Sequence, residues 1–165
     1  LENKLKFYPF IREAVAHGDG RDHVTAFINI DLEAVGTFAE REGISYSGYT
    51  DLAQQERVYE LIQQNIEEVN ADLAQDSSLA SMQINRFLIL HKELDADDGE
   101  LTRTRKLRRR IIADRYEDLI SALFSDKDQV QVNAKITFED GRVGEYNANL
   151  KIKDVKLQEP ARMAS

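Results

Sequence analysis

A run of cationic side chains stands directly after an acidic turn near the middle of the chain. The basic run covers residues 103–110 and contains six cations among its eight residues: Arg103, Arg105, Lys106, Arg108, Arg109 and Arg110. Five acidic residues precede it from Glu93 to Glu100, and Gly99 lies in the same turn. The chain as a whole carries a formal charge of -8, so the basic run opposes the general trend. Positive charge concentrated at the end of a tight turn is typical of a site that binds an anion.

Lys106 is the member of the basic run best suited to act on a phosphate. It follows Gly99 and Thr102 and stands just before the apolar residues of a predicted helix. A lysine carries a compact charge on a long flexible stem, so it can reach a neighbouring domain. Two other interpretations stay open: the run is a solvated face that balances the acidic turn, or a surface that binds nucleic acid or an acidic protein. No aromatic residue interleaves with the cations to stack on bases.

Other catalytic or metal-binding patterns are missing from the sequence. Gly99 could be the sixth residue of a calcium loop only if Leu94 were first, and Arg105 would then replace the final glutamate. The acidic turn is therefore predicted to be solvated. The chain has no cysteine, no Walker loop and no dinucleotide fingerprint, and its histidines share no metal-ligand spacing. The histidines are His17, His23 and His91. We therefore expect no metal site.

The composition predicts one domain, or one domain with a short extension, since the chain has 165 residues of which 42% are hydrophobic. The longest apolar runs are far too short to cross a bilayer, and the absence of cysteine fits a cytoplasmic protein. A net charge of -8 argues against non-specific nucleic-acid binding by the whole surface. The chain begins with Leu1 in what reads as the inside of a helix, so we expect a fragment of a longer protein.

The elements before the acidic turn are predicted from their periodicity. Residues 1–6 form a short helix, and residues 13–17 and 23–30 form a hairpin. Asp31 caps a helix that continues to about residue 41 and stops at Gly43, and residues 45–50 form a loop. Apolar residues at spacings of three and four predict a long helix over residues 55–73, and residues 84–90 form a strand.

The segments after the acidic turn complete an α+β fold. Residues 102–110 are a loop or the opening of a helix that continues to about residue 124. Alternating apolar residues predict an antiparallel hairpin around a turn at residues 139–142, within an extension that spans 126–156. Residues 157–165 are predicted to be a flexible tail. We expect a small mixed sheet covered by helices, with the hairpin packed against it or serving as a dimerisation surface.

Several short segments occur in an order that a known family shares. Residues 1–6 read LENKLK, residues 11–15 read IREAV and residues 18–21 read GDGR. Residues 90–93 read LHKE and residues 99–109 read GELTRTRKLRR. This order resembles the C-terminal domain of AMP-forming long-chain fatty acyl-CoA synthetases, whose pattern is L-P-K-E-F followed by G-x-L-T-P-T-x-K-x-K-R. The resemblance covers about residues 1–125 and leaves the closing hairpin outside the pattern.

The resemblance implies a two-step ligase that uses ATP, Mg²⁺ and CoA. A fatty acid attacks ATP to give an acyl-adenylate and pyrophosphate, and the thiol of CoA then displaces AMP. A large N-terminal domain binds these molecules, while a small mobile C-terminal domain presents a different face in each step. Residues 1–125 would be that mobile domain, with the N-terminal domain as its partner. Alone it would be inactive and would bind no cofactor, and its location would be cytoplasmic, with peripheral membrane contact left open.

The resemblance also assigns roles to residues of the basic run. Lys106 matches the catalytic lysine of the family, which would stabilise the negative charge that develops during adenylation. Arg103, Arg105 and Arg108 are candidates for contacts to phosphate or CoA, in a domain that forms one wall of the thioesterification site. The chain departs from the family at Arg103, where proline is usual, and at His91, where proline is common.

Overall fold

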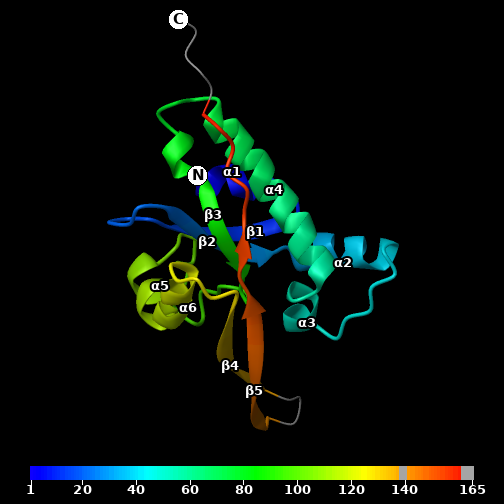
Figure 1. Ribbon diagram of the computed structural model, residues 1–165. Helices are drawn as coiled ribbons and strands as arrows, with labels where there is room; N and C mark the ends of the chain where they lie inside the picture. Colours follow the sequence, from blue (N-terminus) through cyan, green and yellow to red (C-terminus); the bar gives the residue numbers. More distant parts are fainter. Residues whose placement is uncertain (138–140, 161–165) are drawn as a thin grey trace, which may run out of the picture.

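The computed structural model describes residues 1–137 and 141–160 and contains a four-stranded sheet in the order β1-β2-β3-β6 (Figure 1). Its strands are β1 (Ile11–His17), β2 (Val24–Ile30), β3 (Ile84–Ile89) and β6 (Lys153–Asp154). The pairs β1/β2 and β3/β6 are antiparallel, whereas β2/β3 is parallel. The sheet is therefore mixed, and the predicted α+β class is confirmed.

Helices cover both faces of this sheet. Alternate residues of a strand point to opposite faces, so Ile28 packs in one hydrophobic cluster and Phe27 in the other. The first cluster includes residues of α1 (Glu2–Lys6), α2 (Leu32–Arg41), α3 (Tyr49–Ala53) and α4 (Glu56–Ala74). The second includes residues of α5 (Arg109–Arg115) and α6 (Glu117–Leu123). A short 3-10 helix, Ala80–Met82, follows α4. None of the helices in the described residues is long and apolar enough to span a bilayer.

Helix α2 shows how local sequence sets the ends of an element. The side chain of Asp31 accepts a hydrogen bond from the backbone N–H of Ala34 at 3.0 Å, which caps the first turn. At the other end Gly43 has φ +69°, and the N–H of Ile44 donates to the carbonyl of Ala39 at 2.8 Å. This is a Schellman ending, which favours glycine because of the positive φ. Both predicted ends of the helix are confirmed.

Two helix predictions need correction. The predicted loop at residues 45–50 already contains the start of α3, at Tyr49. The helix predicted to continue to about residue 124 is broken into α5 and α6 at Tyr116, where φ is -110° and ψ is 26°. Apolar spacing continues across this break because both halves cover the same face of the sheet. The break coincides with a tertiary contact, since the hydroxyl of Tyr116 donates to the buried carboxylate of Glu100.

The predicted C-terminal hairpin is confirmed as a second sheet of two strands, β4 (Gln129–Thr137) and β5 (Val143–Lys151), seen apart from the main sheet in Figure 1. Part of the predicted turn at 139–142 falls on residues 138–140, which lie outside the described residues. Leu150 and Ile152 at its base are buried in the cluster beneath α6. The chain then enters the main sheet as β6, a strand that the periodicity did not predict because it is only two residues long.

The predicted tail is attached at its start. The backbone N–H of Gln158 donates to the side-chain oxygen of Gln83 at 2.7 Å, and the Gln83 amide nitrogen donates to the carbonyl of Gln158 at 2.9 Å. The chain is therefore held beside the 3-10 helix and the start of β3 as far as Gln158. Residues 161–165 of the predicted tail lie outside the described residues.

Arg86 of β3 joins the main sheet to the segment that leads into the hairpin. Its guanidinium donates to the carbonyls of Ala122 and Leu123 at 3.3 and 3.1 Å, and to those of Ser125 and Lys127. The carbonyls of Ala122 and Leu123 belong to the last turn of α6, where a cation is favourable. The side chain is only 12% exposed, so its removal leaves several carbonyls without a partner.

We expect Arg86→Ala to lower the free energy of unfolding by about 2–4 kcal/mol, because it removes charge-assisted hydrogen bonds from a mostly buried site. Urea denaturation followed by circular dichroism measures the loss. Arg57→Ala is the matched control, since Arg57 is 55% exposed and pairs with Glu42 at the surface. Equal effects of the two substitutions would contradict this account of Arg86.

Candidate functional site

The central part of the basic run forms a tight loop that contains Lys106. Leu101 and Leu107 pair as an isolated antiparallel bridge, which closes the loop at its base. Within it, the N–H of Thr102 donates to the carbonyl of Lys106 at 2.8 Å, and the N–H of Lys106 donates to Oγ1 of Thr102 at 3.0 Å. The N–H of Arg105 donates to the carbonyl of Thr102 at 2.9 Å. Residues 102–108 are thus a structured loop, and α5 begins only at Arg109.

The side chain of Lys106 points out of this loop into solvent. The residue is exposed, and its ammonium has no hydrogen-bond or ion-pair partner among residues 1–137 and 141–160. Its neighbour Leu107 is half-buried against the cluster beneath α5 and α6, which anchors the base of the loop. The backbone of Lys106 is therefore fixed while its charge stays free to meet a ligand or another domain.

The acidic turn is exposed at Asp97 and Asp98, as predicted, but it ends in a buried carboxylate that the prediction of a solvated turn did not include. Glu100 is fully buried. Its Oε1 lies 2.7 Å from Nζ of Lys92, and its Oε2 lies 3.3 Å from a guanidinium nitrogen of Arg115 and also accepts from the hydroxyl of Tyr116. Burial and this contact raise the pKa of Tyr116 above its ordinary value. The two cations and the hydroxyl offset the desolvation of the carboxylate.

The backbone of the turn connects Glu100 to the Lys106 loop. Gly99 has φ +77°, a region that other residues rarely adopt, and its N–H donates to the carbonyl of Ala96 at 3.0 Å. The N–H of Arg108 donates to the carbonyl of Glu100 at 2.9 Å, directly beside the bridge between Leu101 and Leu107. The anchored glutamate therefore fixes both ends of the loop that carries Lys106.

The structure divides the six cations of the basic run into two groups. Arg105 lies 3.6 Å from the carboxylate of Glu13, and Arg109 pairs with Glu2. The other cations are exposed and have no partner in the described part of the chain; they are Arg103, Lys106, Arg108 and Arg110. Of the three arginines predicted to contact phosphate or CoA, Arg103 and Arg108 keep their charge free, whereas Arg105 makes an internal pair.

Sequence reasoning missed Glu13 and Glu100, the two buried carboxylates near this loop. Glu13 is 2% exposed and lies in β1, where it interrupts the apolar residues of the strand. Glu100 is the acidic residue that directly precedes the apolar Leu101. An acid within an apolar strand and an acid just before an apolar residue were the signals that the sequence offered. Neither pattern shows whether the acid is buried or exposed.

The histidines do not form a metal site. No group of three or more histidine, aspartate or glutamate side chains within the described ranges is arranged to hold a metal ion. His17 packs edge-on against Phe27 with ring centroids 4.4 Å apart, and its Nε2 has no hydrogen-bond partner among the residues that the structure describes. Burial lowers the pKa of His17 from 6.5 to about 4. Burial also lowers the pKa of His91.

Stability should fall as the pH is lowered from 6.5 towards 4, because in this window the unfolded chain binds a proton at His17 that the folded chain does not bind. The expected loss from this group is at most about 3 kcal/mol. Urea denaturation at several pH values measures it, and His17→Gln removes the titrating group. The variant should show a shallower pH dependence across this window, and parallel curves would contradict the assignment.

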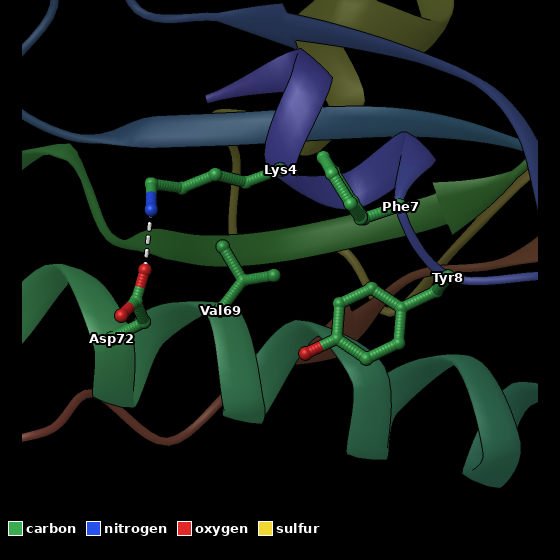
Figure 2. Close-up of a pocket in the computed structure, with 5 residues that line it drawn as sticks. All are labelled: Lys4, Phe7, Tyr8, Val69 and Asp72. Carbon is green, nitrogen blue, oxygen red and sulfur yellow. Dashed lines mark hydrogen bonds and ion pairs between the residues drawn. The ribbon is translucent and has the colours of Figure 1, made fainter.

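A cavity of about 520 Å³ lies away from the basic run, between α1 and α4, and Figure 2 shows its lining. The ion pair of Lys4 with Asp72 joins the two helices at this cavity, and Phe7 beside it is 89% exposed. None of the site residues predicted from the sequence lines it. Its remaining lining residues are Tyr8 and Val69.

No family model matches the chain, but several known proteins are similar to it. A long-chain-fatty-acid–CoA ligase of Mycobacterium tuberculosis is 29% identical over 126 residues, which are 76% of this chain and 20% of that enzyme. A second fatty-acid–CoA ligase of the same species is 33% identical over 133 residues, 80% of this chain and 22% of that enzyme. A rat long-chain-fatty-acid–CoA ligase is 27% identical over 147 residues, 78% of this chain and 20% of that enzyme.

Solved structures share the fold. The A-PCP didomain of a carboxylic acid reductase from Segniliparus rugosus, in complex with AMP, aligns with a TM-score of 0.55 at 17% identity, over 74% of this chain and 15% of that one. The adenylation domain of a carboxylate reductase from Mycobacterium chelonae aligns with a TM-score of 0.53 at 21% identity, over 76% of this chain and 17% of that one. The resemblance seen in the sequence is thus confirmed: over three quarters or more of its length this chain is similar to fatty-acid–CoA ligases, and it spans about a fifth of the length of these relatives.

Proposed function

We propose that this chain is the mobile C-terminal domain of a cytoplasmic AMP-forming long-chain fatty acid–CoA ligase, and that it supplies Lys106 to the adenylation step. The observation that carries the proposal is the exposed, unpaired ammonium of Lys106 on a loop whose backbone is fixed at both ends. A group that acts on a ligand held by another domain needs this combination of a free charge and a rigid base.

The chemistry would use Lys106 as an electrostatic catalyst. When a fatty-acid carboxylate attacks the α-phosphorus of ATP, negative charge increases on the phosphoryl oxygens while pyrophosphate leaves. An ammonium placed at these oxygens stabilises the transition state more than the bound substrates. Mg²⁺, held by the rest of the enzyme, would neutralise phosphate charge. The residues described for this chain offer no metal site of their own.

The exposed arginines fit the second step of the proposed reaction. Arg103 and Arg108 flank Lys106 in the loop, and neither has a partner within residues 1–137 and 141–160. Two free guanidinium groups on one loop suit the phosphates of CoA, because each guanidinium can donate two parallel hydrogen bonds to a phosphate group. The domain would thereby form one wall of the thioesterification site once AMP is to be displaced.

Alone, the chain should form no acyl-adenylate, because one lysine cannot orient ATP and a fatty acid without their pockets. ATP–pyrophosphate exchange dependent on fatty acid measures this, first with the isolated chain and then with the full-length ligase that contains it. We expect exchange only in the full-length enzyme. Exchange by the isolated chain, or none in a full-length enzyme that binds ATP, would each contradict the proposal.

A second candidate function follows from the four unpaired cations of the basic run, which could bind an anionic partner such as nucleic acid or an acidic protein. Two of the six cations are already neutralised by Glu13 and Glu2, which reduces the charge left for such a partner. Fluorescence anisotropy with labelled DNA and RNA separates the two functions. Salt-sensitive binding in the sub-micromolar range would favour this candidate over the ligase.

A further inference from the structure

The residue immediately before Lys106 has an unusual backbone. Arg105 has φ +64°, and it is the only residue other than glycine with a positive φ in the described part of the chain. This left-handed region is unfavourable for a residue with a side chain, so the surrounding structure must hold it there. The conformation turns the chain sharply between Thr104 and Lys106, and it therefore sets the direction in which the lysine leaves the loop.

The side chain of Arg105 is anchored on a strand far away in the sequence. Its guanidinium lies 3.6 Å from Oε2 of Glu13, whose Oε1 lies 3.1 Å from Nζ of Lys6. Glu13 is 2% exposed, so its carboxylate is a fixed point and not a mobile surface group. Burying a charged carboxylate is costly unless cations lie beside it. Lys6 and Arg105 therefore stabilise Glu13 in its buried position.

A second contact holds the first residue of α5, directly after the loop, to the same edge of the sheet. Arg109 pairs with Glu2, and the other carboxylate oxygen of Glu2 accepts from the backbone N–H of Ala16 at 2.8 Å. Ala16 lies in β1, which is an edge strand of the sheet. The basic run is thus attached to α1 and β1 on both sides of Lys106.

We propose that Glu13 and Arg105 act as a positioning pair that orients Lys106 for adenylation, so that Arg105 serves the lysine and does not itself contact phosphate or CoA. This rests on the proposed function. The pair holds Arg105 in the left-handed conformation, and that conformation directs the neighbouring ammonium outward. Loss of either side chain frees the backbone to leave this region, and the ammonium then samples directions away from the reacting phosphate.

A positioning role and a direct phosphate contact predict opposite effects of Glu13→Gln. If Arg105 contacted ATP, loss of the competing carboxylate would free its guanidinium and lower the KM for ATP. If Arg105 positions Lys106, the same substitution lowers kcat for adenylation and leaves the KM for ATP nearly unchanged. Lys6 and Arg105 are partly exposed, so both can be solvated when the carboxylate is lost and the variant should remain folded.

The test uses fatty-acid-dependent ATP–pyrophosphate exchange by the full-length ligase. Glu13→Gln and Arg105→Ala should each lower kcat about tenfold, and the double variant should be no slower than either single one. Arg105→Lys should keep most of the activity. The kcat of Arg105→Gly should lie between those of Arg105→Lys and Arg105→Ala, because glycine adopts a positive φ without strain but cannot pair with Glu13. Arg110→Ala is the matched control, since Arg110 is an exposed, unpaired cation of the same run, and it should match the wild type.

A kcat of Glu13→Gln within about twofold of the wild type, additive single effects, or a lower KM for ATP in that variant would each overturn the positioning role. Lys106→Ala, measured in the same assay, reports separately on the proposed function. If Lys106→Ala is as fast as the wild type, the proposed function fails. If Lys106→Ala is slow and the pair variants are not, only the positioning role fails.

A measurement on the isolated chain checks the pair without any activity. The backbone N–H groups of Arg105 and Lys106 are protected by hydrogen bonds to Thr102, so their hydrogen exchange reports on the loop. Glu13→Gln should accelerate exchange at these two amides and leave that of β3 unchanged. Unchanged exchange at both amides would overturn the proposal whatever the kinetics show.

Discussion

Lys106→Ala should slow acyl-adenylate formation by the full-length ligase about 10²- to 10³-fold. The expected size is that of removing one preorganised donor from a site where charge develops in the transition state. The substitution should leave the fold intact, because the side chain is exposed and has no partner in the described part of the chain. ATP–pyrophosphate exchange and single-turnover formation of acyl-adenylate both measure the effect.

The two half-reactions should respond differently to Lys106→Ala. Formation of acyl-CoA from supplied acyl-adenylate should be much less affected, since that step does not require charge stabilisation at the bond to pyrophosphate. Arg110→Ala serves as the control for a general loss of positive charge from the basic run. Equal losses in both half-reactions, or an equal loss in the control variant, would remove Lys106 from the catalytic role.

Glu100→Ala should produce the largest loss of stability among substitutions near the site, about 3–5 kcal/mol in the free energy of unfolding. The carboxylate is fully buried and is the shared partner of Lys92, Arg115 and Tyr116. Without it, Arg115 loses its counter-charge, Lys92 keeps only its pair with Asp98, and a buried hydroxyl loses its acceptor. Urea denaturation followed by circular dichroism measures the change, and Glu100→Gln should show a smaller loss because it keeps the shape and one acceptor.

Asp97→Asn is the control for Glu100, because Asp97 lies in the same acidic turn but is exposed. Its effect should stay within about 0.5 kcal/mol. A general effect of charge in the turn would make the two substitutions similar, and that outcome would contradict the anchoring role. At temperatures where it remains folded, Glu100→Gln in the full-length ligase should also show slower adenylation, since Glu100 fixes the base of the Lys106 loop.

Much of the fold could be predicted from local patterns, for identifiable reasons. Asp31 and Gly43 set the ends of α2 through contacts within a few residues, so the sequence alone located them. The apolar stripe of α4 and the alternation in β4 and β5 follow from the periods of the helix and the strand. The segment order around Lys106 indicated the resemblance to fatty-acid–CoA ligases, and the relatives confirmed that resemblance.

The features that the sequence did not predict depend on contacts between distant segments. The two-residue strand β6 forms only because β3 offers an edge for it, and the helix breaks at Tyr116 where the side chain meets Glu100. Burial of a carboxylate depends on the cations that the fold brings to it. Glu100 and Asp97 are both acidic residues of the same turn, but Glu100 is buried and Asp97 is exposed.

The sequence by itself determined the α+β class and most element boundaries, because these depend on residue types and their spacing along the chain; it also made Lys106 the candidate catalytic residue, a role that stays a prediction. Only the tertiary structure decided that Lys106 is free while Arg105 and Arg109 are paired, and that Glu13 and Glu100 are the fixed points beneath its loop. Residue type gives all the cations of the basic run one charge and all the acids of the turn the other. The environment of each side chain, and so whether its charge is available to a ligand, is set by the segments that pack around it.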